Sequence, residues 1–227
     1  MSILKRYTQG VAFDVRKAGD GDNAGRITTL AGLASRTGTE YVLFVDNEWR
    51  ERWVELIMPG AFRHVLNDDV RVLINHDDNK VLGRTAAGTA KIWESDEGLN
   101  YQWDNDSRIS YAADLERSIE RGDITQSSFG FSLKPDGYEW VISTDEDGWT
   151  TNKHIIKPGG ISKLWDVSPV TYPANPDTSV IFNSIRRSLD EWKKHHRGGN
   201  NTHAADSLNL LRRGIEAKSR HLEIKNY

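Results

Sequence analysis

Three residue types within the first 170 positions could together cleave a peptide bond: a histidine, a serine and an acid. A serine hydroxyl is a weak nucleophile until a neighbouring base takes its proton, and that base needs a group to orient it. The candidates are Ser128 for the nucleophile, His76 for the base and Asp166 for the orienting acid, and residue types alone leave a structural role open for each. The sequence has no cysteine, which excludes a cysteine nucleophile, disulfides and thiolate metal sites.

The base is chosen from the three histidines that precede the basic C-terminal region, namely His64, His76 and His154. His76 follows the apolar run 70–74, so its ring can face a cleft where a strand leaves the core. His64 falls in a predicted short helix, and His154 falls in a polar hairpin region. Taken alone, a histidine at a strand end is more often an ordinary polar loop residue.

A metal site is the alternative at the same place. His76, Asp77 and Asp78 are all residue types that bind metal ions. Consecutive residues of a strand point to opposite faces, however, so three in a row seldom converge on one ion. We therefore predict no cofactor, and a metal-dependent hydrolase centred on these three residues remains an alternative.

The serine and the acid are less specific signals. Ser127 and Ser128 alternate faces in a predicted strand, so only one of them can point at His76. Asp166 lies within an apolar strand, where a carboxylate needs a partner. That partner is either the histidine or a cation, Lys163 or Arg84, so a structural ion pair remains open.

The elements that must position these residues are mainly strands. Short runs rich in Val, Ile, Tyr and Trp alternate with clusters of Gly, Asn and Asp, which is typical of an α+β or mainly β domain. Helices are predicted at 59–66 and at 107–121, with Ser107 as N-cap and Gly122 as left-handed stop. The predicted strands are 11–15, 27–34, 41–45, 53–57, 70–74, 89–93, 99–103, 124–133, 138–142 and 161–170.

The chain changes character after residue 183. Residues 184–227 contain ten Lys or Arg and five Asp or Glu, whereas the remainder contains 20 and 28, so opposite net charges suggest two roles. We predict a domain at 1–183 and a basic tail at 184–227, with helices at 184–196 and 204–223 joined by a flexible segment. We do not expect nucleic acid as a target of the tail, because Trp192 is its only aromatic residue before Tyr227.

No stretch of the sequence approaches the roughly 18 apolar residues of a membrane span. Residues 1–16 also lack the apolar run of a signal peptide. We therefore expect no membrane partner.

Four short blocks, in order along residues 27 to 180, together resemble the prohead proteases of tailed bacteriophages, which are capsid-maturation serine peptidases. Each block alone is weak, and the order of all four makes the resemblance specific. Two departures are Ser127, where an apolar residue is common, and residues 138–156, which look like an insertion. The blocks are Glu55–Phe62, Ile74–Asp77 followed by Leu82–Thr85, Gln126–Phe131 and Leu164–Pro176.

The resemblance implies a role for each site residue. The family's histidine and serine fall on His76 and Ser128, and Asp166 takes the position of the third member, which is often Glu in the family. Backbone amides near Gly130, or a water held by Arg84, are the candidates for oxyanion support. The implied fold is a mainly antiparallel β-barrel flanked by helices, similar to the herpesvirus assemblins.

The resemblance also implies substrates and a location. The implied substrates are the scaffold or a scaffold-like segment of the major capsid protein. The implied location is the inside of a procapsid in the host cytoplasm. Self-cleavage is expected near Gly198–Gly199 or within the tail, and a homodimer or higher oligomer is left open. The rival from another class is a non-catalytic assembly module on the same fold.

Overall fold

A computed structural model describes residues 4–8, 13–17, 26–172, 189 and 192–194. The chain divides into two units, Met1–Trp192 and Lys193–Tyr227. Of the predicted helix 184–196, the described residues Leu189 and Trp192–Lys194 are helical. The remainder of that helix, the helix at 204–223 and the expected self-cleavage point lie outside the described residues. The domain boundary after residue 183 stays a prediction.

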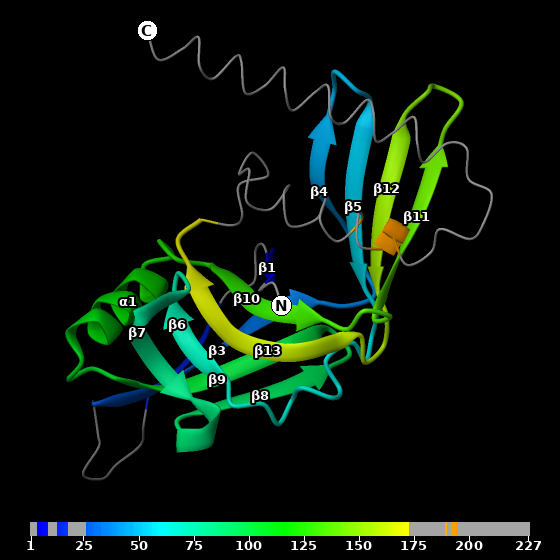
Figure 1. Cartoon of the computed structure of the whole chain (residues 1–227). Helices are drawn as coiled ribbons and strands as arrows, with labels where there is room; N and C mark the ends of the chain where they lie inside the picture. The colour runs from blue at the N-terminus through cyan, green and yellow to red at the C-terminus, as the bar shows by residue number, and fades with distance from the viewer. Residues whose placement is uncertain (1–3, 9–12, 18–25, 173–188, 190–191, 195–227) are drawn as a thin grey trace, which may run out of the picture. The chain divides into compact units, whose positions relative to one another are not determined.

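The strands that carry Ser128 and Asp166, and the hairpin whose turn carries His76, belong to one five-stranded sheet (Figure 1). β13 lies in its centre, antiparallel to β10 and parallel to β6, so residues far apart in the chain become neighbours. β6 and β7 form a hairpin at one edge, and β1 forms the other edge. In order across the sheet the strands are β1 Leu4–Thr8, β10 Gln126–Leu133, β13 Ile161–Val170, β6 Arg71–Ile74 and β7 Asp77–Arg84.

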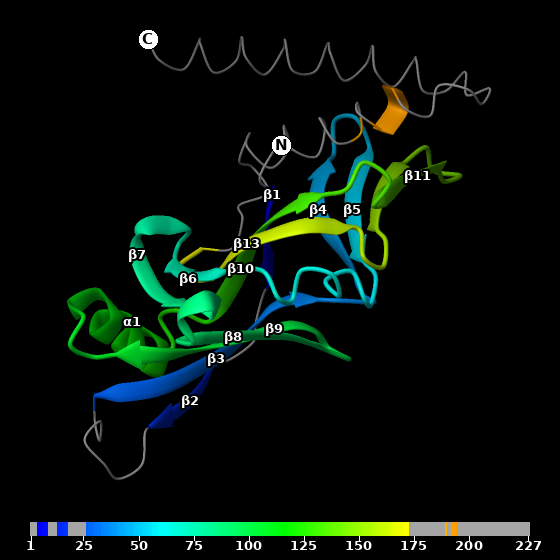
Figure 2. The ribbon, with the colours of Figure 1, turned by 60° about the horizontal axis from the view of Figure 1, so that its bottom comes forward.

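A four-stranded antiparallel sheet packs against the five-stranded sheet, and Figure 2 shows it as the lower layer. Its β8–β9 hairpin turns at Asp96 and Glu97, and Gly98, the first residue of β9, has a φ of 140°. The side chains of Leu99, Tyr101 and Trp103 alternate inward along β9 and are fully buried. The strands, in order, are β2 Asp14–Lys17, β3 Ile27–Arg36, β9 Gly98–Asp106 and β8 Ala90–Ser95.

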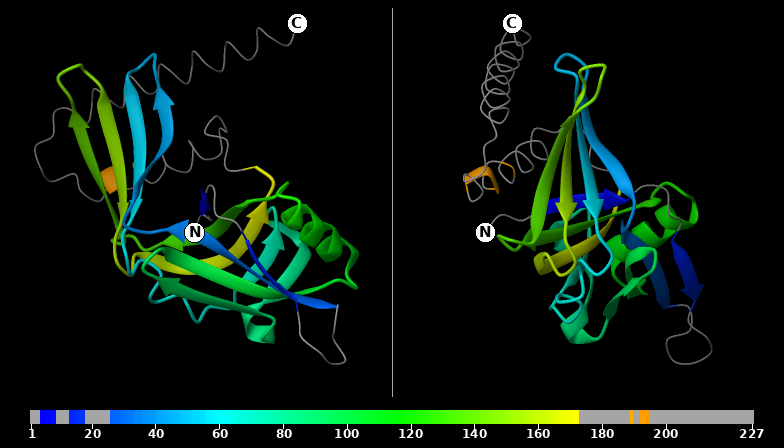
Figure 3. Two further views of the ribbon diagram at one scale, coloured as in Figure 1. Left: turned by 180° about the vertical axis from the view of Figure 1, so that it is seen from behind. Right: turned by 90° about the vertical axis from the view of Figure 1, so that its right-hand side faces the viewer.

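A third sheet, here called the hairpin sheet, consists of two hairpins joined side by side (Figure 3). β12 pairs with β5 in parallel, and the other two pairings are antiparallel. Its inner end contributes Ile57 and Ile156 to the hydrophobic core. The strands, in order, are β11 Tyr138–Thr144, β12 Thr150–Ile156, β5 Glu51–Ile57 and β4 Glu40–Asp46.

β10 and β13 present two chemically different faces. Phe129, Phe131 and Val167 point into the hydrophobic core. There the rings of Phe129 and Phe62 pack edge to face, with 5.5 Å between their centroids. The alternate positions of both strands point to the opposite face, which carries Ser128 and Asp166. The core therefore fixes the two strands from one side and leaves the other side for polar side chains.

The expected mainly antiparallel β-rich architecture is confirmed, whereas a closed barrel is not found. In the part of the chain that the structure describes, the ladders form three open sheets. β10 contacts β3, and β7 contacts β9, by packing of their faces without a ladder between them. Alternating residues indicate that a strand is half-buried, but they do not say which strand it pairs with. Whether the sheets close into a barrel therefore could not be predicted from this pattern.

The two predicted helices fared differently. Residues 59–66 form a succession of turns rather than a helix, with bonds such as Val65 N–H to Phe62 O spanning three residues. The helix α1 covers Ser110–Glu120, and 3-10 turn η1 covers Thr85–Ala87. The helix predicted at 107–121 is thus present as α1, but Ser107 is not the N-cap of α1. The Ser107 hydroxyl donates to Arg26 O, and α1 starts after Ile109.

The end of α1 and its buried face match the prediction. Gly122 has a φ of 79° just beyond the helix, as a left-handed stop requires. Ala112, Leu115 and Ile119 form the buried face. Among the described residues, no helix is long and apolar enough to cross a membrane.

Candidate active site

His76 lies in the tight turn that joins β6 to β7. Ile74 pairs with Asp77, so Asn75 and His76 are the two central residues of the turn. Their φ angles are 53° and 58°, and a two-residue hairpin turn of this kind requires positive φ at both positions. Asn tolerates this conformation better than most residues, and it precedes the histidine here.

The turn is fastened to the end of β13 by main-chain and side-chain bonds. The Asn75 N–H donates to Pro169 O at 3.1 Å. The Asn75 side chain donates to Thr171 Oγ1 at 3.1 Å and accepts from the Thr171 N–H at 2.8 Å. Because these bonds hold both sides of Asn75, the following residue has a fixed direction despite its place in a turn.

The structure brings His76, Ser128 and Asp166 together. The His76 ring is hydrogen-bonded through Nε2 to Ser128 Oγ and through Nδ1 to Asp166 Oδ2, the latter at 2.5 Å. Ser128 is fully buried, and only 4% of the His76 side chain and 9% of the Asp166 side chain are exposed. A hydroxyl, an imidazole and a carboxylate thus form a continuous chain in a largely dry site, where electrostatic interactions are strong.

Ser168 completes this cluster and was missed from the sequence. Its hydroxyl donates to Asp166 Oδ2 at 2.9 Å and accepts from the His76 main-chain N–H at 3.3 Å. Ser168 is fully buried and lies directly opposite Ser128 in the β10–β13 ladder. The available signal was its spacing of two from Asp166, which places both side chains on one face of a strand.

Ser127 points away from the cluster, as strand alternation requires. Its hydroxyl is hydrogen-bonded to the Tyr101 hydroxyl at 2.9 Å on the core side. Burial raises the pKa of Tyr101, so this phenol stays protonated. Ser127 and Ser128 therefore form a natural pair of neighbouring serines, of which one faces the histidine.

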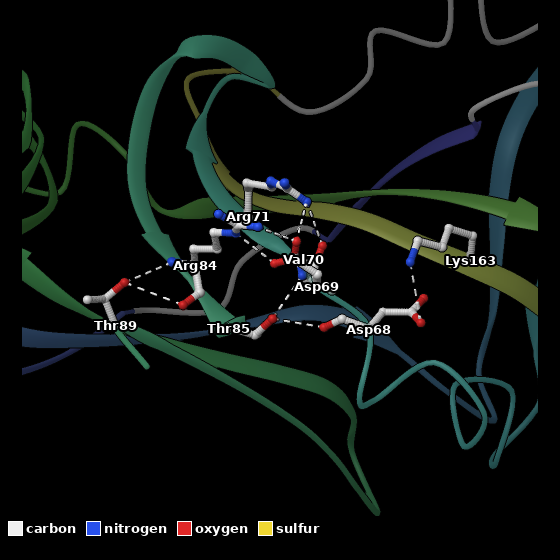
Figure 4. A network of polar contacts seen from close by, with 8 residues as sticks. All are labelled: Asp68, Asp69, Val70, Arg71, Arg84, Thr85, Thr89 and Lys163. Atoms are coloured by element: carbon white, nitrogen blue, oxygen red, sulfur yellow. Dashed lines mark hydrogen bonds and ion pairs between the residues drawn. The ribbon is translucent and has the colours of Figure 1, made fainter. Parts of the chain in front are cut away.

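Arg84, an expected oxyanion support, is engaged elsewhere. Its guanidinium donates from Nε and Nη2 to the two carboxylate oxygens of Asp69, at 2.8 and 2.7 Å (Figure 4). Arg84 pairs with Arg71 on β6, which in turn pairs with Asp166, so β13 and β6 separate Arg84 from the strand of Ser128. The network in Figure 4 holds the β6–β7 hairpin to the preceding loop, and we withdraw Arg84 as a water holder.

Gly130, the second expected oxyanion support, lies between two strands. It pairs with Lys5 of β1 on one side and with Asp166 of β13 on the other. The main-chain groups of a strand with two neighbours face those neighbours rather than an open cleft. Its main chain is therefore poorly placed to meet an oxyanion.

The alternative metal centre does not assemble. Asp77 Oδ1 accepts two bonds from Asn79, and Lys80 lies 3.8 Å from Asp77 Oδ2. The Asp78 side chain is exposed. Within the residues that the structure describes, no group of three His, Cys, Asp or Glu side chains could hold a metal ion.

The two other histidines have different surroundings from those of His76. His64 is exposed and accepts a hydrogen bond from Arg63. His154 is fully buried in the hairpin sheet, where its Nδ1 lies 2.8 Å from Glu55 Oε2. Glu55 is also bound by Arg6 Nε at 2.6 Å and by the Tyr41 hydroxyl. Neither histidine contacts Ser128.

The resemblance that the four sequence blocks indicate agrees with a comparison against known protein families. The family model described as the caudovirus prohead serine protease matches residues 15–195, which is most of the chain. The chain belongs to this family. The prohead protease of Enterobacteria phage HK97 is 24% identical over 171 residues, which cover 73% of this chain and 71% of that protein. No solved structure matches the chain, so the likeness to assemblins stays a prediction.

Proposed function

We propose that this member of the prohead serine protease family is an active endopeptidase in which Ser128 is the nucleophile, His76 the general base and Asp166 the orienting acid. The observation that carries the proposal is the continuous hydrogen-bonded chain from Ser128 Oγ through the His76 ring to Asp166 Oδ2. Nucleophile, base and orienting group in this sequence are the parts that hydroxyl-based acyl transfer needs.

The proposed reaction has two steps. Ser128 Oγ attacks the scissile carbonyl carbon while its proton passes to His76 Nε2. The C–N bond then breaks, the proton goes to the leaving amine, and the acyl group remains on Ser128. In the second step, water attacks this ester, His76 takes the water's proton, and Ser128 recovers its hydroxyl as the acid product leaves.

Asp166 contributes by accepting from His76 Nδ1. This bond selects the tautomer whose Nε2 lone pair faces Ser128, and the carboxylate stabilises the imidazolium that forms in each step. A carboxylate in this position needs no proton of its own. Its second donor, the Ser168 hydroxyl, keeps Oδ2 aimed at the ring.

The proposed substrates follow from family membership and from the name of the HK97 relative, a prohead protease. We propose cleavage of the scaffold, or of a scaffold-like segment of the major capsid protein, and of the chain itself. The reaction would take place inside the procapsid, in the host cytoplasm. A homo-oligomer is compatible with this role.

The test compares two neighbouring serines. Ser128→Ala should reduce self-cleavage and turnover by at least about 10³-fold, because it removes the nucleophile of a triad. Ser127→Ala is the matched control, since this residue has the same type and faces Tyr101 instead. Intact mass over several hours reports self-cleavage, and a fluorophosphonate probe followed by peptide mapping reports the reactive serine.

Labelling of wild type and Ser127→Ala, but not of Ser128→Ala, is the expected result. Processing that survives in Ser128→Ala removes this residue from the mechanism. A chain that is neither labelled nor active would favour the non-catalytic assembly module. Loss of activity in EDTA, restored by a divalent ion, would revive the metal-dependent alternative.

A further inference from the structure

A cavity of about 300 Å³ opens beside the imidazole of His76. It is formed where the β6–β7 turn meets the end of β13. Its walls are Asn75, His76, Val170, Thr171 and Tyr172. The cavity shares His76 with the proposed catalytic chain, and none of its other wall residues takes part in the chemistry described above.

The strand register places this cavity in line with the proposed catalytic residues. Along one face of β10 and β13 lie three successive cross-strand pairs: Gly130 with Asp166, Ser128 with Ser168 and Gln126 with Val170. Each step along this row is two residues, or roughly 7 Å. The pair that contains the cavity wall Val170 is thus the next step after Ser128, within reach of a peptide residue beside the scissile bond.

Gln126 adds an unsatisfied hydrogen-bond acceptor at the same step. Its Oε1 atom is buried and has no hydrogen-bond partner within the described part of the chain. A buried polar atom left unpaired costs about 1–3 kcal/mol. Directly opposed residues of an antiparallel pair have adjacent side chains, so this acceptor lies next to Val170. A peptide N–H is the donor that an extended substrate would offer there.

The walls of the cavity select against charge. The polar groups of Asn75 and Thr171 are hydrogen-bonded to each other, which leaves them little to offer an ion. Val170 and the ring of Tyr172 supply apolar surface. Among the wall residues that the structure describes, none is Asp, Glu, Lys or Arg. A charged side chain would lose water here without gaining a partner of opposite sign.

We propose that this cavity is the specificity pocket for one substrate side chain near the scissile bond, that it admits uncharged side chains, and that Gln126 Oε1 accepts a hydrogen bond from the main chain of the bound peptide. The inference rests on the proposed function, because it supplies that proteolytic site with its substrate selection. Gln126 is a substrate-binding residue in this scheme, and Tyr172 forms the rim of the pocket.

Cleavage-site profiling of the full chain on a mixed peptide library tests the pocket. Wild type should exclude Lys, Arg, Asp and Glu at one position near the cleaved bond. Tyr172→Glu places a carboxylate at the rim, where the native side chain is 79% exposed, so folding should be unaffected. We expect this variant to raise cleavage with Lys or Arg at that position by about tenfold, as one opposite charge nearby would.

The matched control is Trp49→Glu, which also replaces an exposed aromatic residue by a carboxylate. Trp49 lies in the turn between β4 and β5, on the hairpin sheet. The cleavage-site preferences of the Trp49→Glu variant should equal those of wild type. An unchanged profile in Tyr172→Glu, with cleavage intact, overturns the pocket alone. A wild-type chain that cleaves no peptide overturns the proposed function and the pocket with it.

Gln126→Leu tests the acceptor with a readout that separates binding from folding. If Gln126 Oε1 binds substrate, this variant should raise KM about tenfold while the melting temperature stays equal or rises, because an unpaired buried acceptor is removed. A lower melting temperature with an unchanged KM would mean that Gln126 has a structural role, and would overturn its assignment.

Discussion

At the scale of single residues, the Ser168 hydroxyl serves two partners at once. It donates a hydrogen bond to the Asp166 carboxylate and accepts one from the His76 main-chain N–H. These two bonds hold the acid and the base at a fixed distance from each other. In addition, Ser168 lies directly opposite Ser128 in the β10–β13 ladder, which places the acid and the base next to the nucleophile. We infer that Ser168 is a positioning residue, which acts through its neighbours.

Ser168→Ala should lower kcat by about 10- to 100-fold, because a hydrogen bond to a charged group contributes roughly 1.5–3 kcal/mol. The KM should stay the same, since Ser168 is fully buried and makes no contact with substrate in the proposed scheme. Steady-state kinetics on one cleaved peptide provides both numbers. Asp166→Asn should cost more, about 10⁴-fold, by favouring the wrong tautomer.

A suitable control for this variant is Ser132→Ala. Ser132 is another buried serine of the five-stranded sheet, and its hydroxyl accepts from the Trp165 indole N–H at 3.0 Å. That change should affect stability with little effect on kcat. Equal kcat values for Ser168→Ala and wild type would contradict the positioning role.

At the scale of elements, alternation of residue types located most strands, and β13 begins and ends at the predicted residues. β1, β7 and β12 were missed because each includes polar or charged residues: β7 starts with Asp77-Asp78-Asn79-Lys80. Their strand conformation comes from partners across the sheet, which local composition does not reveal. The turns at 59–66 were mistaken for a helix because Ala61, Phe62 and Val65 are buried without helical bonding.

The same contrast applies to the candidate site. Ser128, His76 and Asp166 were selectable from residue type, strand position and family blocks, and the structure places them in contact. Arg84 could not be judged from the sequence, because its partner Asp69 lies in a loop with no distinctive pattern. Ser168 likewise becomes meaningful only when the β13 register is known.

The positive φ of Asn75 leads to a prediction about the β6–β7 turn. Asn75→Ala and Asn75→Gly both lose the bonds to Thr171, but only alanine also bears the steric cost of a left-handed backbone. The alanine variant should therefore be less stable than the glycine variant by about 1 kcal/mol. Urea denaturation of the two proteins measures the difference.

Arg50 provides the control, since it has a φ of 52° in the turn between β4 and β5. The same pair of changes there should show a similar stability difference. Only the Asn75 pair should alter protease activity, because only that turn carries His76. A glycine variant of Asn75 less stable than its alanine counterpart would contradict the backbone argument.

At the scale of the whole domain, a buried ionic cluster joins two sheets. Arg6 of β1 belongs to the five-stranded sheet, whereas Glu55 and His154 belong to the hairpin sheet. All three side chains are almost fully buried. Removing one member would leave an uncompensated charge, which typically costs about 3–5 kcal/mol. The cluster thus holds the strand beside β10 to a different part of the domain.

The cluster makes stability depend on pH. Burial lowers the pKa of His154 below its ordinary 6.5, despite the opposing effect of Glu55. Burial alone would raise the pKa of Glu55, but the charge of Arg6 and the hydrogen bonds from His154 and Arg6 outweigh it and bring the pKa well below its usual range. Both groups therefore bind protons more readily in the unfolded chain, so acid favours unfolding.

The free energy of unfolding should be highest above pH 6.5 and should fall as the pH drops below that value, with a further fall near pH 4 as carboxylates protonate in the unfolded chain. Urea denaturation between pH 5 and pH 8 measures the first part. His154→Phe should flatten the slope in this window, whereas the exposed His64→Gln should leave it unchanged. A flat wild-type profile would contradict the assignment.

The position of β10 between β1 and β13 has a consequence for newly made chains. Its neighbours are β1 and β13, which are the first and the last of the described strands along the chain. Until translation passes residue 170, the nascent polypeptide holds serine and histidine without the ladder that aligns them with their acid. On the proposed mechanism, a product that ends before β13 lacks Asp166 and Ser168, and we expect it to be inactive as a protease.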